Sequence, residues 1–418
     1  MPRLSPTLAA ARLPQRAQDH TPVQRVRWAL VAMFGLFGVV QTSWMGRLPS
    51  VREALGVDSG QLGVVLVVAA VGSLIGVMAI GTVIVRWGSG VTLWIGMSGT
   101  LAGFTLAGLG TAAGSVPLFV VGVLLNGLVG PATNVPINLE AARVEKLLGK
   151  AVLPQVHAAF SVGALIGSAL AATTSTLAIP VVWHIVGVAV LVSAARATLI
   201  RRGTALQDAP RGRVPKPAEH ESRRRGDRGS ALHAWTEPRT LLIGLVLLAA
   251  TMSEGAAANW LNLAVVDGFA TREAVGAIAY GTFVVAMLSV RLLGAGLIDR
   301  FGRVAVLRVS GISALVGLLA FGLGPSLPFA WAGIVLWGAG AAMAYPVGTA
   351  AAADDPTKAA ARVSVVGSFG SIASLSAPPV LGLLADSWGT RHALLVITVA
   401  MVVSVSVVGV VRPERAKS

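Results

Sequence analysis

The sequence predicts an all-α integral membrane protein with twelve transmembrane helices in two six-helix bundles. Of its 418 residues, 55% are hydrophobic and only 12% are charged, whereas soluble domains carry about 25% charged residues. Apolar runs of about 20 residues, long enough to cross a ~30 Å hydrocarbon core, recur along the chain. A basic segment, residues 195–239, separates these runs into two groups. Together these observations favour a polytopic membrane protein over a soluble domain.

The apolar runs predict a division of the chain into five segments. We expect a disordered cytoplasmic tail (1–25), a six-helix bundle (26–199), a basic cytoplasmic connector (200–239), a second bundle (240–411) and a short cytoplasmic tail (412–418). The spans expected in the first bundle are 28–48, 61–85, 91–110, 116–139, 153–177 and 179–199. Those in the second bundle are 241–266, 275–298, 304–323, 328–352, 364–385 and 393–411.

The distribution of basic residues supports this topology. With the N-terminus in the cytoplasm, 28 of the 33 lysines and arginines fall in cytoplasmic segments, and eleven of them lie in the 195–239 region. Such an excess follows the positive-inside rule and places both termini in the cytoplasm. The net charge of +15 therefore reflects membrane topology rather than nucleic-acid binding. We expect a multi-pass protein of the cytoplasmic (inner) membrane that acts as a monomer.

The two groups of spans resemble each other. Span eight ends in Leu297-Ile-Asp299-Arg300-Phe-Gly302-Arg303, and span two ends in Val83-Ile-Val85-Arg86-Trp-Gly88-Ser89. In span four, Asn134-Val-Pro136-Ile-Asn138 corresponds to Ala344-Tyr345-Pro346-Val-Gly348 in span ten. A repeat of two six-helix units is typical of transporters whose halves rock about a midplane site.

The turn Asp299-Arg300-Phe301-Gly302-Arg303, in a 6+6 arrangement around a basic connector, resembles the signature loop of the major facilitator superfamily. The resemblance implies two pseudo-symmetric bundles and a secondary transporter. In that family the motif's Asp and Arg hold the cytoplasmic side shut in the outward-facing state, which implies a cytoplasmic gate at Asp299, Arg300, Gly302 and Arg303. The first copy departs from the pattern, since Val85 and Ser89 replace the Asp and the final Arg.

A narrower resemblance points to uncharacterised bacterial inner-membrane members that are distantly similar to fucose permeases. It rests on Arg47-Leu-Pro49, on His157 and on Ser253-Glu254-Gly255-Ala256. The Gly-Pro signature that drug/proton antiporters carry in span five is missing from residues 161–172. This absence disfavours an efflux function.

Two charged residues, Glu254 and Arg291, lie deep within predicted spans. Glu254 falls near mid-bilayer, where an acidic side chain costs about 2.5–3.5 kcal/mol on insertion scales. We expect it to carry the coupled proton, and the alternative is a neutral structural carboxylic acid. Arg291 could bind an anionic substrate, pair with Glu254 or extend to the cytoplasmic interface. A difference in depth of about 10 Å argues against assuming the pair.

Polar side chains in several spans predict a binding site for a small polar solute. Gln41 and Trp44 share one face of span one, and Asn134 and Asn138 share one face of span four. The alternative for the amides is hydrogen bonding between helices. The expected substrate-binding residues are Gln41, Trp44, Asn126, Asn134, Asn138, Asn262, Arg291, Tyr345 and His157.

Three aromatic side chains have competing interpretations. Trp260 could extend the binding site, but we expect it in the aromatic belt at the membrane interface. His157 could relay protons or form an interfacial hydrogen bond. Tyr345 could line the cavity or a gate, or anchor its helix at the interface.

The sequence contains no cysteine, P-loop, metal-ligand cluster or nucleophile triad, so we expect no enzyme activity, no cofactor and no metal. The expected partners are the lipid bilayer, protons and a small-molecule substrate, with no nucleic acid. The leading hypothesis is proton-coupled uptake of a sugar-like solute. The alternatives are proton-driven efflux of amphipathic compounds and a receptor or scaffold that transports nothing.

Overall fold

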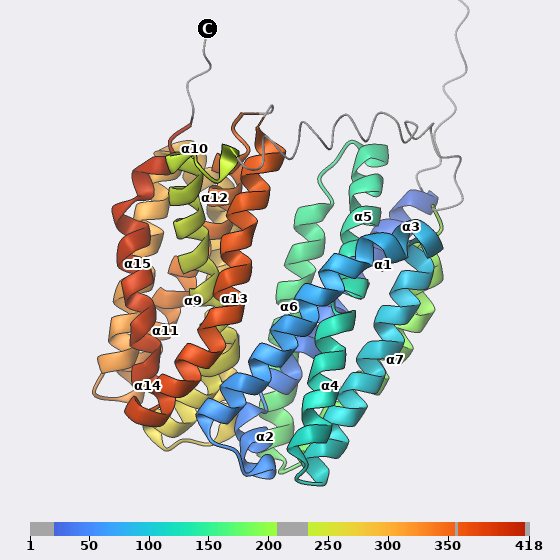
Figure 1. Cartoon of the computed structure of the whole chain (residues 1–418), viewed down its shortest axis with the longest axis vertical. Helices are drawn as coiled ribbons and strands as arrows, with labels where there is room; N and C mark the ends of the chain where they lie inside the picture. The colour runs from blue at the N-terminus through green and yellow to red at the C-terminus, as the bar shows by residue number, and fades with distance from the viewer. Residues whose placement is uncertain (1–20, 207–232, 356–357, 414–418) are drawn as a thin grey trace, which may run out of the picture.

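Two groups of helices lie side by side in the computed structural model, which describes residues 21–206, 233–355 and 358–413 (Figure 1). The N-terminal half contains α1 (Thr21–Met45), α2 (Leu48–Leu55), α3 (Ser59–Ala112), α4 (Val116–Val129), α5 (Pro131–Leu148), α6 (Leu153–Thr176) and α7 (Val181–Gly203). The C-terminal half contains α9 (Pro238–Phe269), α10 (Glu273–Leu323), α11 (Leu327–Ala341), α12 (Ala344–Ala352), α13 (Ala359–Trp388), α14 (Thr390–Ala393), η1 (Leu394–Val396), α15 (Ile397–Ser406) and η2 (Val408–Val411). The all-α membrane fold expected from the sequence is confirmed.

The long helices α3 and α10 each contain a sharp turn at a glycine. Gly88 in α3 has φ 78° and ψ 168°, and Gly302 in α10 has φ 78° and ψ 158°. Residues with a side chain rarely adopt this conformation, because Cβ clashes with the backbone. The two turns occupy corresponding positions in the two halves, in agreement with the repeat seen in the sequence.

The fourth span of each half is also interrupted. In the N-terminal half, α4 ends at Val129 and α5 begins at Pro131, and in the C-terminal half α11 ends at Ala341 and α12 begins at Ala344. Pro346 has no N–H and cannot bond the carbonyl oxygen of Ala342 four residues earlier. Such freed carbonyls must find other donors inside a membrane protein.

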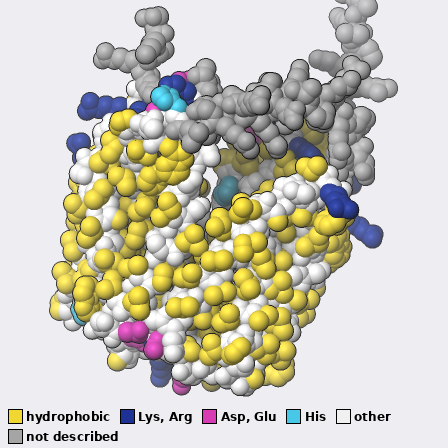
Figure 2. Space-filling model, in the orientation of Figure 1, with side chains coloured by type: hydrophobic (Ala, Val, Ile, Leu, Met, Phe, Trp, Pro, Cys, Tyr) yellow, Lys and Arg dark blue, Asp and Glu magenta, His cyan; other side chains and the backbone are white. Residues whose placement is uncertain are grey.

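The halves meet at one end of the molecule and separate toward the other (Figure 1). We call the end where α1 begins, α7 ends and α9 begins the connector end, and the opposite end the closed end. Small residues bring α3 and α13 together at the closed end, where a Cβ on Gly63 would lie 2.8 Å from the carbonyl oxygen of Pro378. The surface is hollowed between the halves toward the connector end (Figure 2).

Some boundaries differ from those expected. Helix α1 begins at Thr21, so residues 21–25 are helical rather than part of the tail. Arg27 donates from Nη1 to Gln24 Oε1 at 3.1 Å within this part of α1 and from Nε to Gln155 Oε1 of α6 at 2.8 Å. Helix α7 continues to Gly203. It contains Arg196, one of the eleven basic residues of the 195–239 region, and this side chain is fully buried. Residues 1–20, 207–232 and 414–418, which include most of the predicted tails and connector, lie outside the described residues.

The last span is less regular than expected. Instead of one helix over 393–411, the chain forms α14, η1, α15 and η2. In the described part of the chain, nine helices are long and apolar enough to cross a membrane, and two of these are α3 and α10 with their internal turns. The count of twelve crossings and the cytoplasmic position of both termini stay predictions.

Candidate functional site

A cavity of about 460 Å³ lies between the two halves. Its walls come from α1, α3, α4, α5, α7, α9 and α13, and among the described residues that line it none carries a charge. Most of the lining is aliphatic or aromatic. The polar and indole side chains on the wall are Gln41, Trp44, Ser73, Asn126, Asn134, Thr251, Asn259, Trp260 and Ser374.

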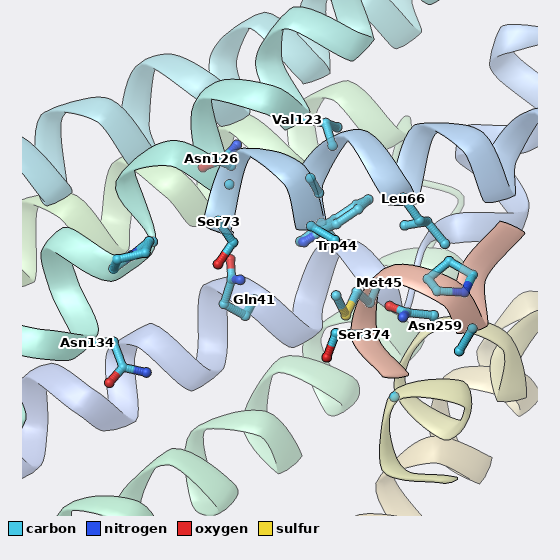
Figure 3. A pocket seen from close by; sticks show the side chains of 18 of the residues that line it. Gln41, Trp44, Met45, Leu66, Ser73, Val123, Asn126, Asn134, Asn259 and Ser374 are labelled. Carbon is cyan, nitrogen blue, oxygen red and sulfur yellow. The ribbon is translucent and has the colours of Figure 1, made fainter. Parts of the chain in front are cut away.

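The N-terminal half contributes an amide and an aromatic platform. Gln41 and Ser73 point toward each other across the cavity, and the indole of Trp44 lies beside them (Figure 3). Trp44 is held in place by Phe104, whose ring centroid lies 6.1 Å away. Asn126 donates from Nδ2 to the carbonyl oxygen of Gly122 at 3.2 Å. These side chains offer hydrogen bonds and a flat apolar surface to a neutral ligand.

Helix α9 contributes the face that sequence reasoning missed. Thr251, Gly255 and Asn259 recur every four residues and line the cavity. Trp260 also lines it and is only 1% exposed, so its expected position in the aromatic belt is wrong. Trp260 Nε1 and Thr251 Oγ1 are buried without a hydrogen-bond partner among the described residues. The spacing of Thr251 and Asn259 on span seven was the available signal for this face.

Two of the predicted asparagines do not line the cavity. Asn138 donates from Nδ2 to Asn134 Oδ1 at 2.6 Å, and only Asn134 is on the wall. Asn262 is buried and donates from Nδ2 to the carbonyl oxygen of Gly46 at 2.6 Å. Asn262 therefore joins the two halves instead of extending the binding site. This agrees with the alternative given for the amides, hydrogen bonding between helices.

Glu254 and Arg291 form an ion pair beside the cavity. Arg291 Nη2 lies 2.7 Å from Glu254 Oε1, and Arg291 Nε donates to the freed carbonyl oxygen of Ala342 at 3.1 Å. The two side chains are 30% and 29% exposed. Gly255, the next residue after Glu254, is part of the cavity wall. The pair, which the sequence left open, is therefore present next to the predicted substrate site.

His157 and Tyr345 lie outside the cavity wall. The His157 ring packs edge-on against Phe34, with centroids 5.3 Å apart, and is close enough to Arg291 to interact with it electrostatically. Tyr345 follows the break between α11 and α12 and is exposed. Neither contacts the neutral cavity directly.

Ion pairs join the two halves at the closed end. Arg47 Nε lies 2.8 Å from Glu273 Oε2 in an ion pair. The backbone N–H and the hydroxyl of Ser50 donate hydrogen bonds to Glu273, at 2.9 and 2.7 Å. Arg52 makes two hydrogen bonds to Asp267, each of 2.7 Å. The sequence did not predict these contacts.

Comparison with known proteins identifies the family. The model of the Major Facilitator Superfamily matches residues 29–361 and 243–418. The chain belongs to this superfamily. It is 30% identical over 370 residues to the uncharacterised transporter y4wD of Sinorhizobium fredii, and the match covers 88% of this chain and 93% of the relative.

Solved structures of other superfamily members share the fold. The nucleoside transporter NupG superposes with a TM-score of 0.70 at 14% identity, covering 94% of this chain and 100% of NupG. The transporter FucP in its outward conformation superposes with a TM-score of 0.64 at 15% identity, covering 94% of this chain and 100% of FucP. The distant similarity to fucose permeases expected from the sequence is confirmed.

The superfamily's signature loop lies at the connector end. Arg303 Nη1 lies 2.7 Å from Asp354 Oδ1, and Arg239 Nη2 lies 3.0 Å from Asp354 Oδ2. Asp299 and Arg300 are exposed, and the Arg300 guanidinium lies over the Phe301 ring at 5.2 Å. The ion pairs seen here lie within the C-terminal half. The predicted cytoplasmic gate at Asp299, Arg300, Gly302 and Arg303 would form in the conformation in which the connector end is shut. It stays a prediction.

Proposed function

We propose that this superfamily member is a secondary transporter that moves a small uncharged polar solute by alternating access, coupled to protons through Glu254. The connector end then faces the cytoplasm, because basic residues gather in the segments assigned to it. In this conformation the closed end would be the extracellular side. The proposed direction of transport is uptake, and the proposed class of substrate is a sugar-like solute.

The observation that carries the proposal is the neutral wall of the cavity. A charged ligand bound against uncharged side chains would lose its hydration without a compensating ion pair, which costs several kcal/mol. A hydroxylated solute can instead bond Gln41, Asn126 and Asn259 and stack on Trp44. Two structural neighbours, the nucleoside transporter NupG and the fucose:proton symporter FucP, handle solutes of this kind.

The ion pair supports the proton coupling. Glu254 is held by Arg291, so protonation of the carboxylate weakens this pair and changes the packing of α9 against α10 next to the cavity. Glu254 lies on α9, and α9 also forms part of the cavity wall. Proton binding and solute binding would therefore act on the same helix. Ionisable groups inside membrane helices are functional candidates by default.

Transport in lightly buffered vesicles tests the proposal. We expect pH changes when neutral sugars, polyols or nucleosides are added to the wild-type protein. Glu254→Gln should abolish accumulation driven by a pH gradient and retain counterflow exchange, since the cavity is intact. Glu53→Gln, which removes an exposed carboxylate of α2, is the matched control and should behave as wild type. Gradient-driven accumulation by Glu254→Gln would exclude Glu254 as the proton carrier.

A second candidate function is proton-driven efflux of amphipathic compounds. The largely apolar cavity wall favours it. The sign of the proton movement decides between the two, because uptake by symport and efflux by antiport move protons in opposite directions relative to the solute. A response to charged solutes alone would contradict the neutral-substrate class in both cases.

A further inference from the structure

A groove lies between the start of α1 and the end of α7 at the connector end. It is lined by Gln24, Arg25, Trp28, Ala29, Leu199 and Arg202, which we call the basic groove. It forms where α7 crosses α1, since a Cβ on Gly203 would meet the methyl group of Met33. It is separate from the cavity between the halves and has no role in the proposed transport cycle.

The chemistry of the basic groove is suited to an anionic amphiphile. Arg25 and Arg202 approach it from two helices, and both are exposed. Trp28 is 58% exposed, and the Arg27 guanidinium lies over its ring at 4.8 Å. Exposed tryptophan beside arginine at the end of a membrane-spanning helix is typical of the headgroup region. Ala29 and Leu199 add an apolar wall below the arginines.

Among the described residues, no ion pair joins a carboxylate to Arg25 or Arg202. The two glutamates of α5, which packs against α1, have other partners: Glu140 pairs with Arg143, and Glu145 accepts from the backbone N–H groups of Val152 and Leu153. The sequences of α1, α6 and α7 contain no aspartate or glutamate. Residues 1–20, which precede α1, contain three arginines and one aspartate, and residues 207–232, which follow α7, contain seven basic and four acidic residues. Both segments are net positive, so charge does not favour either of them as the occupant of the groove.

We propose that the basic groove binds the phosphate headgroup of an anionic phospholipid such as phosphatidylglycerol. Arg25 and Arg202 hold the phosphodiester from two sides, Trp28 lies at the level of the glycerol backbone, and Leu199 contacts the upper acyl chain. The bound lipid links α1 to α7 and stabilises the N-terminal half at the connector end. Basic pockets between transmembrane helices are known to bind anionic headgroups.

Thermal stability of the full-length purified protein in a zwitterionic detergent tests the proposal. Phosphatidylglycerol should raise the melting temperature of the wild type, and phosphatidylcholine at the same concentration should not. In the double variant Arg25→Gln/Arg202→Gln the apparent Kd for phosphatidylglycerol should increase about 5-fold for each arginine removed, or about 25-fold in total. Equal stabilisation by both lipids in the wild type would overturn the proposal without any variant.

A charge-matched control separates this groove from general basicity. Arg86→Gln/Arg308→Gln removes two exposed arginines, one of which lies over the exposed Trp87 as Arg27 lies over Trp28. The control should bind phosphatidylglycerol as tightly as wild type. Equal loss in both double variants would assign the effect to net charge and overturn the site. Equal stabilisation by inorganic phosphate would show a free-phosphate site and overturn the lipid assignment.

Discussion

The two ends of the molecule use their charged side chains differently. At the closed end, Arg47 and Glu273 pair across the two halves, while at the connector end Arg303 and Asp354 pair within one half. An ion pair between the halves stabilises only the conformation in which the halves touch at that end. An ion pair within one half stays intact when that half moves as a rigid body. The comparison indicates that the closed end is held shut by contacts that must break before it opens.

The largest effect is expected from breaking the closed end at Arg47. The Arg47 and Glu273 side chains are 5% and 10% exposed, and removing one partner of a buried ion pair costs about 3–5 kcal/mol. Arg47→Ala should therefore favour opening of this end. Ala277 of α10 is fully buried against the N-terminal half, where a Cβ on Gly46 would lie 3.6 Å from its Cβ. Because the chain has no cysteine, a single Ala277→Cys probe reports the opening, and we expect its labelling by a membrane-impermeant maleimide to be at least ~100-fold faster.

Arg52→Ala provides the matched comparison for Arg47. Arg52 and Asp267 also pair across the halves, but their side chains are 25% and 29% exposed, and pairs of this kind contribute about 0–1 kcal/mol. The labelling rate should rise by less than about tenfold. Equal rates in the two variants would show that burial does not set the strength of these contacts.

A smaller effect is expected at the two glycine turns. Gly88→Ala and Gly302→Ala should each lower stability by about 1–3 kcal/mol, since both positions have φ 78°. Gly81→Ala and Gly296→Ala, in helical segments where a Cβ meets no atom within 4 Å, should instead stabilise by up to about 1 kcal/mol. Thermal unfolding in detergent measures all four. A large difference between Gly88→Ala and Gly302→Ala would contradict the geometric repeat.

The last effect depends on pH and concerns Glu237, which precedes α9 at the connector end. Burial disfavours the charged carboxylate, but hydrogen bonds from Arg362, Lys358 and Thr240 outweigh this and lower its pKa to about 2. The resulting stability is complete above pH about 4.5, the ordinary pKa, and is lost as the pH falls toward 2. The melting-temperature difference between wild type and Glu237→Gln should shrink as pH falls from 6 to 3. A constant difference would contradict this role.

The repeat elements of the fold could be predicted from local sequence, and the contacts between halves could not. Gly88 and Gly302 mark the turns because only glycine adopts their backbone angles, and the prolines mark the breaks. Pairs such as Arg47–Glu273 and Arg52–Asp267 join residues more than 200 positions apart. Their formation depends on how the two halves pack, which periodicity and composition do not encode.

The same distinction applies within the candidate site. Gln41, Trp44, Asn126 and Asn134 were identified because amides and indoles are unusual in apolar spans. The Glu254 and Arg291 pair was left open because counting ~1.5 Å per residue along upright helices gives depth along each axis only. Helix tilt and the length of the arginine side chain together can span the difference in depth of about 10 Å between the two residues.

The hydrogen bond from Arg291 Nε to Ala342 has an electrical consequence. In the proposed transport cycle, the guanidinium would remain attached to the backbone when Glu254 accepts a proton, because Pro346 leaves this carbonyl oxygen free to accept its hydrogen bond. The positive charge would then stay fixed in the membrane field while the proton moves with a neutral solute. Each cycle would carry one net charge, so a membrane potential of 100 mV would contribute about 2.3 kcal/mol to accumulation.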